Sequence, residues 1–182
     1  MKQEELDIIL ENHGKWLRNE GGERANLRNA ELKNTNLRLI NLNLASLRGA
    51  DLRGAYLRDA NLSNADLSSA DLSNAGLRGA CLSGTDLRGA YLRDANLSNA
   101  DLDLANWQQV GGLTVIAVQV DTSRLNNQIA YIKELDIWTT GCFQGTLDEL
   151  KASVEQTHKH NEKLKKRYYR VIDFILNEVE EE

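Results

Sequence analysis

The 182-residue chain contains no proline, only two cysteines and three histidines, and aromatic residues make up 5% of it. Two cysteines cannot form the disulfide framework of a small secreted domain. No stretch approaches the roughly 20 apolar residues that span a membrane. The charged segment from Met1 to Leu17 lacks the apolar core of a signal peptide. These absences predict a protein of the reducing cytoplasm that has no membrane-spanning segment.

Charge of a single sign is also scarce. The formal net charge is −5, and segment 25–109 holds nine acidic and nine basic residues. A protein that binds nucleic acid concentrates bases on one surface, and an acidic mimic of DNA concentrates acids. Neither pattern is present, so direct nucleic-acid binding is not expected.

Residues suited to catalysis are few as well. The histidines are His13, His158 and His160, and no nucleophile stands at a recognisable spacing from a base. His158 and His160 with Cys142 match no usual zinc spacing and lack a fourth ligand. Gly-rich phosphate-binding loops are missing too. We therefore expect a protein without enzymatic activity, bound metal or cofactor.

What the chain does contain is a five-residue repeat over 25–109, of the form Ala, polar, Leu, polar, small or polar. Leu recurs at every fifth position from Leu27 to Leu102, and Trp107 closes the series. A helix places apolar residues every 3.6 positions and a strand every second one, so a period of five fits neither. A fixed short repeat is typical of a solenoid, in which each unit rests on its neighbours.

This pattern resembles the pentapeptide repeat family, whose consensus is Ala-(Asp/Asn)-Leu-X-X. The resemblance implies an all-β solenoid: a right-handed quadrilateral β-helix with four repeat units per coil and about four coils over 25–109. Leu at the centre of each unit and Ala two residues earlier would fill the interior. The predicted structural core is the ladder of central leucines: Leu47, Leu52, Leu57, Leu62, Leu67, Leu72, Leu77, Leu82, Leu87 and Leu92.

Residues 1–24 are predicted to form an N-terminal capping helix, whose helical part covers 2–20 with Leu6, Ile9, His13 and Trp16 on its apolar face. An open solenoid end exposes unpaired backbone groups and an apolar interior, which such a helix would cover.

Three leucines break the outward polar rule of the repeat: Leu39, Leu44 and Leu104. Exposed apolar clusters usually mark contacts. Leu39 and Leu44 are therefore expected beneath the capping helix, and Leu104 against the C-terminal module.

Residues 110–182 are predicted to form a small α+β module. Stretches rich in β-branched residues indicate strands, and Thr146 followed by Glu149 has the form of a helix capping box. The segment from Gly141 to Leu147 also resembles a tail found in some bacterial and phage pentapeptide repeat proteins. Strands are expected over 113–120, 128–132 and 135–140, and helices over 147–157 and 161–179.

An internal duplication argues against a recognition surface on the repeat. Asp51 to Leu67 recurs unchanged as Asp86 to Leu102, at an offset of 35 residues or seven units. Seven is not a multiple of four, so the copy falls on a different wall of the coil. We therefore predict partner binding by the C-terminal module, through its aromatic residues Trp138, Phe143, Tyr168 and Tyr169.

Two functions follow. The first is a non-catalytic protein-interaction protein, a rigid β-helix whose C-terminal module binds a protein partner or forms a homodimer. The alternative, which the family resemblance implies, is a DNA-mimicking inhibitor of a DNA-binding enzyme such as type II topoisomerase or a phage-defence nuclease. In that case Asp51, Asp71, Asp101 and Asp103 would imitate phosphates.

Overall fold

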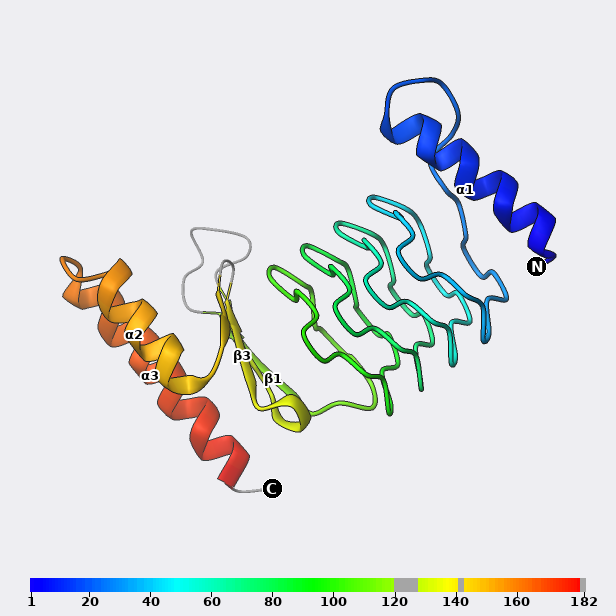
Figure 1. Cartoon of the computed structure of the whole chain (residues 1–182). Helices are drawn as coiled ribbons and strands as arrows, with labels where there is room; N and C mark the ends of the chain where they lie inside the picture. Colours follow the sequence, from blue (N-terminus) through cyan, green and yellow to red (C-terminus); the bar gives the residue numbers. More distant parts are fainter. Residues whose placement is uncertain (120–127, 141–142, 181–182) are drawn as a thin grey trace. The chain divides into compact units, whose positions relative to one another are not determined.

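The computed structural model describes residues 1–119, 128–140 and 143–180 (Figure 1). The chain divides into two compact units, Met1–Gly112 and Leu113–Glu182. The first contains a helix followed by stacked coils, and the second contains a sheet and two helices.

The coils of the first unit repeat every twenty residues. Parallel bridges join residue i to residue i+20, from Asn26 with Ser46 to Tyr91 with Gly111. Backbone hydrogen bonds follow this spacing, and Leu27 N donates to Ser46 O at 2.7 Å. Since a unit has five residues, each coil holds four units and has four walls.

The interior of the coils is the ladder of central leucines. Every one from Leu27 to Leu102 is at most 1% exposed. Most of the Ala residues that precede them are buried too, and the exception at Thr85 satisfies its hydroxyl by donating to Leu62 O at 2.9 Å. Burial of this continuous apolar column stabilises the coils, at about 25 cal/mol per Å² of apolar surface.

Each repeat unit ends in a tight turn that explains its small or polar fifth residue. The N–H after the turn donates back to the central Leu, as from Ala50 to Leu47 O at 3.0 Å. The fifth residue has positive φ throughout, for example 56° at Asn64 and 64° at Gly54. A turn with positive φ only at its third residue is type II, which favours Gly and Asn.

The second residue of most units is Asn or Asp for a similar local reason. Its side-chain oxygen accepts a hydrogen bond from the backbone N–H two residues later, at 3.0 Å from Ser63 to Asn61 and from Ser73 to Asp71. This Asx turn holds the wall-to-corner bend in place.

Helix α1 (Gln3–Leu17) precedes the coils and is shorter than the predicted 2–20. Its Leu6 and His13 are buried, whereas Ile9 and Trp16 are partly buried. His13 stacks on Trp16 with ring centroids 5.7 Å apart, and its Nδ1 accepts a hydrogen bond from Ala25 N at 3.1 Å. The helix is therefore fixed to the first coil by a buried imidazole.

The second unit is built on an antiparallel sheet in the order β1-β2-β3-β4. Its strands are β1 (Val115–Gln119), β2 (Gln128–Ile132), β3 (Ile137–Thr140) and β4 (Phe143–Gly145). The predicted hairpin of β2 and β3 is present, but a short 3₁₀ turn (Lys133–Leu135) occupies the expected start of β3. Strand β4 was not predicted from the sequence. Val120, the predicted end of the first strand, and Cys142, considered above as a zinc ligand, lie outside the described residues.

Helices α2 (Leu147–Thr157) and α3 (Glu162–Glu180) pack on one face of this sheet (Figure 1). The capping box of α2 is formed: Thr146 N donates to Glu149 Oε2 at 2.8 Å and Glu149 N donates to Thr146 Oγ1 at 3.3 Å. Over the described residues, no helix has the length and apolar character needed to cross a membrane. The buried core of the unit consists of Ile129, Trp138, Leu150, Val154, Tyr168, Ile172 and Ile175.

Candidate functional site

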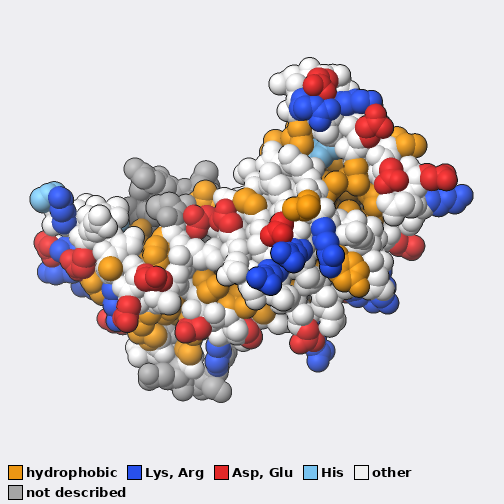
Figure 2. All heavy atoms as spheres, in the orientation of Figure 1, with side chains coloured by type: hydrophobic (Ala, Val, Ile, Leu, Met, Phe, Trp, Pro, Cys, Tyr) orange, Lys and Arg blue, Asp and Glu red, His pale blue; other side chains and the backbone are white. Residues whose placement is uncertain are grey.

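Several charged side chains of the coil walls pair with close neighbours. Arg53 donates to Asp51 through Nε at 2.8 Å, and its Nε lies 3.8 Å from Asp71 Oδ2. The hydrogen bond from Arg53 lowers the pKa of Asp51 to about 2. On the face shown in Figure 2, bases and acids lie beside one another over much of the surface. These walls present mixed charge rather than a field of one sign.

The duplication preserves the pair between Arg53 and Asp51 because it is local in the sequence. In the second copy, Arg88 donates to Asp86 at 2.9 Å, as Arg53 does to Asp51 in the first. A pair two residues apart in the sequence moves intact with its segment, whichever wall receives it. Charge balance therefore survives the change of wall.

The wall that contains Cys81 differs, because the outward second, fourth and fifth residues of its units include no base. Cys81 Sγ lies 2.9 Å from Ser63 Oγ and donates to Asp101 Oδ2 at 3.4 Å. Burial, and then repulsion from Asp101, raises the pKa of Asp103, whose buried Oδ1 has no hydrogen-bond partner in the described structure.

The four acids proposed for DNA mimicry therefore fall into two different environments. Asp51 and Asp71 share Arg53, which offsets their charge. Asp101 and Asp103 lie two residues apart without a neighbouring base, and burial followed by the charge of Asp101 raises the pKa of Asp103. The structure does not join the four into one acidic stripe.

Exposed leucines at the coil corners are the feature that polar pairing does not explain. Leu39, Leu44 and Leu104 have φ of 59°, 64° and 59°, at the turn position that other units fill mostly with Gly, Asn, Asp or Ser. An L-residue in this conformation costs about 1–2 kcal/mol unless it is Gly or, less often, Asn or Asp. The prediction that the N-terminal helix covers Leu39 is wrong, because that side chain is 77% exposed.

A cationic aromatic contact lies near this corner. The guanidinium of Arg38 lies 5.2 Å from the ring centroid of Tyr56, whose side chain is about half exposed. The duplicate of Tyr56 is Tyr91, which is exposed on another wall, and no cation stacks on it among the described residues.

Two of the four aromatic residues predicted to bind a partner are core residues instead. Trp138 is 1% exposed and packs on Tyr131 at 4.8 Å, and Tyr168 packs on His158 at 5.1 Å. Their burial between sheet and helices leaves no face for a partner, which corrects the prediction for both.

The other two aromatic residues, Phe143 and Tyr169, are partly buried at the edge of the core. The hydroxyl of Tyr169 donates to Glu155 Oε1 at 2.9 Å. Each keeps an accessible portion, and so both stay candidates for partner contact.

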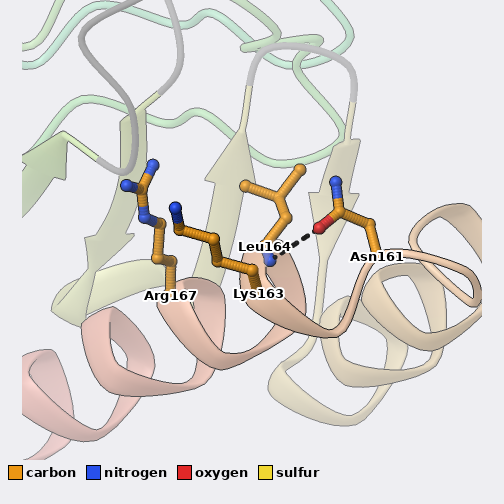
Figure 3. A pocket seen from close by; sticks show the side chains of 4 residues that line it. All are labelled: Asn161, Lys163, Leu164 and Arg167. Carbon is orange, nitrogen blue, oxygen red and sulfur yellow. Dashed lines mark hydrogen bonds between the residues drawn. The ribbon is translucent and has the colours of Figure 1, made fainter.

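Helix α3 borders a small hollow at its N-terminal end. At its start Asn161 Oδ1 accepts from Leu164 N at 3.0 Å, and Lys163 and Arg167 project to the same side (Figure 3). With Leu164, these residues line a hollow of about 160 Å³. Further along the same helix, Phe174 is exposed. It lies four residues after Arg170, and this helical spacing could have revealed from the sequence that Phe174 shares the exposed face of Arg170.

Within 1–119, 128–140 and 143–180, no three His, Cys, Asp or Glu side chains gather in a way that could hold a metal ion.

Comparisons with known proteins bear on the coils. The model of the family described as pentapeptide repeats (8 copies) matches residues 45–84 and 70–106. None of the curated protein sequences compared with the chain matches it.

The solved structures that are similar to the chain include two cyanobacterial proteins. The pentapeptide repeat protein Rfr23 from the cyanobacterium Cyanothece 51142 is 38% identical over 48% of this chain and 60% of its own, with a TM-score of 0.47. The pentapeptide repeat protein alr5209 from Nostoc Pcc 7120 is 39% identical over 54% of this chain and 74% of its own, also with a TM-score of 0.47. The sequence identity, together with the family match, confirms the predicted right-handed β-helical solenoid. The chain belongs to the pentapeptide repeat family.

Proposed function

We propose that this protein is a non-catalytic protein-interaction protein, in which a rigid β-helix supports a C-terminal unit that binds a protein partner or a second copy. The observation that carries the proposal is the set of apolar side chains held exposed on rigid elements of both units. Leu39 and Leu44 project from coil corners, and Phe174 projects from α3. Exposed apolar residues that burial does not explain are typical of contact surfaces.

The C-terminal unit is the favoured binding part. The coil walls balance their charge internally, and the duplication places the same outward residues on different walls. Phe143 and Tyr169 occur once and lie at the edge of the sheet-and-helix core. We also propose that the protein is located in the cytoplasm.

The test is capture of partners by the full-length protein from an extract of the organism that produces it. We expect Phe143→Ala with Tyr169→Ala to lose the captured partner, since both supply the accessible aromatic surface. The matched variant replaces Arg38, Arg58 and Arg78 with Ser and is expected to retain it. Unchanged melting of both variants is the folding control. Loss of the partner with the arginine variant alone would move the binding surface to the coil wall.

DNA mimicry is the second candidate, and the acids without a neighbouring base support it. Asp101 and Asp103 are the pair to test, because Arg53 offsets Asp51 and Asp71. The experiment is DNA supercoiling by a type II topoisomerase with and without the protein. Inhibition that disappears in Asp101→Asn with Asp103→Asn would favour mimicry over the interaction proposal.

A further inference from the structure

Helix α3 carries its charges in the order that is unfavourable for an isolated helix. The helix dipole favours acids near the N-terminus and bases near the C-terminus. Helix α1 follows this rule, with Glu4 and Glu5 in its first turn and Lys15 in its last. In α3, bases crowd the first half and the last turn contains none. Glu162 in the first turn follows the rule, but the bases after it leave positive charge in the first half that the helix dipole does not offset.

Four exposed residues of α3 form one straight row. Lys166, Arg170, Phe174 and Glu178 follow one another at intervals of four, and all are exposed. Residues four apart lie next to one another on a helix and form a surface ridge. Ile172 and Ile175, on the opposite side, are buried in the core. We call these four residues the α3 ridge.

The basic residues of the α3 ridge form no ion pair within the part of the chain that the structure describes. Lys165, one position away, pairs with Glu155 at 3.1 Å and with Glu162 at 2.6 Å. Across the described residues, neither Lys166 nor Arg170 forms such a pair. The ridge therefore presents two uncompensated cations, an exposed ring and an acid, in that order.

We propose that the α3 ridge pairs antiparallel with the α3 ridge of a second copy of the chain. When two copies of the ridge run in opposite directions and are centred on position 172, each ridge residue faces a complementary residue of the other copy. Lys166 then faces Glu178 of the second copy, and Arg170 faces the ring of Phe174 of the second copy. Two-fold symmetry repeats both contacts. Each dimer gains two ion pairs and two cation–π contacts, of which the latter are strengthened by partial desolvation.

A second copy fits this surface better than a lipid or a nucleic acid does. An anionic membrane or a phosphate backbone would meet Asp173 and Glu178 on the same face. A reversed copy of the ridge instead meets every charge with its complement.

The dimer is expected to be weak. One helix pair buries less than the roughly 1,000 Å² that marks a stable interface. We expect a dissociation constant on the order of 10–100 μM, rising as salt screens the ion pairs. This inference rests on the proposed protein-binding role and deepens it by naming one partner.

The test is sedimentation of the full-length protein over a concentration series. Lys166→Glu alone places Glu against Glu178, and Glu178→Lys alone places Lys against Lys166, so each single variant is expected to be at least tenfold weaker. A mixture of the two variants makes every pair complementary, and we expect it to form a heterodimer at least as tight as the wild-type dimer. Lys159→Glu is the charge-matched control on an exposed residue outside α3 and should dimerise normally.

Phe174→Ala supplies a second, uncharged measurement and should also weaken self-association, whereas Tyr91→Ala, an exposed aromatic in the coils, should not. A wild-type protein that is monomeric throughout the series overturns the inference, as does a mixture that sediments like its separate components. Both results leave partner capture intact if the proposed function holds. Normal self-association without capture of another protein would confine the proposed function to the second copy, whereas loss of both would remove that function.

Discussion

The two units of this chain reach a buried core by opposite routes. In the coils, a residue's position within its five-residue unit decides its environment, and every central Leu from Leu27 to Leu102 is buried alike. In the C-terminal unit, neighbours in the core come from distant segments, as Ile129, Trp138, Leu150 and Ile172 do. The coils depend on local geometry repeated many times, whereas the second unit depends on a single assembly of unlike parts.

This difference predicts how each unit tolerates change. A charged side chain is expected to be destabilising anywhere in the interior of the coils, because each coil packs directly on the next. The exterior of the coils is tolerant, since turns and Asx bonds are rebuilt within each unit. In the sheet-and-helix unit, tolerance follows packing at individual sites.

The largest effect is expected for Leu67→Asp, which buries a carboxylate in the middle of the coils. We expect a loss of about 4 kcal/mol or more in the free energy of unfolding. Ser98→Asp is the control, because Ser98 is exposed at the fourth position of a unit. Equal denaturant midpoints for the two variants would contradict the division into inside and outside.

A somewhat smaller effect is expected for Trp138→Ala, which removes a fully buried indole from the second unit. Truncation of a buried Trp costs about 3–5 kcal/mol. Hydrogen exchange should show lost protection in β2, β3 and α3, while amides of the central coils stay protected. Equal loss of protection in the coils would show that the two cores unfold as one.

The third effect concerns pH and the first coil. Burial lowers the pKa of His13; the Asn43 backbone opposes this shift and the charge of Arg24 adds to it. A lowered pKa means that neutral His13 stabilises the fold above its unfolded value of 6.5, and that this stability is lost as pH falls below that value. The loss is at most about 1.4 kcal/mol per pH unit.

Protonation also removes the acceptor that Nδ1 offers to Ala25 N. Hydrogen exchange of α1 between pH 8 and pH 5 measures the effect, and His13→Gln should flatten the profile. A variant with the same pH dependence as the wild type would assign the transition to other groups.

The smallest effect is expected for Leu39→Asn, and its sign is favourable. Asn tolerates positive φ better than Leu, and the exposed Leu39 loses little burial, so we expect a gain of about 1 kcal/mol in stability. Thermal melting measures it, with Asn64→Leu as the reverse change at a matched corner. If Leu39 contacts a partner, capture should weaken although the protein melts higher.

The sequence could reveal the coils because their physics is local. Leu at the centre, Ala before it and Asn or Gly at the turn each report their role within five residues. It could not reveal that Trp138 and Tyr168 are buried, since that depends on helices packing from elsewhere in the chain. Strand β4, only Phe143–Gly145, is too short to carry a pattern of its own. The prediction for Leu39 was wrong for another reason. An apolar residue in a polar series suggests a buried contact, whereas this Leu occupies an exposed turn with positive φ.

The four-unit coil turns segment length into orientation. Inserting one five-residue unit would advance everything after it by a quarter turn, whereas inserting four would lengthen the stack and leave every wall where it was. The seven-unit offset of the duplication acts as one full coil plus three quarters. The direction in which a grafted side chain points could therefore be set by the number of repeat units that precede it.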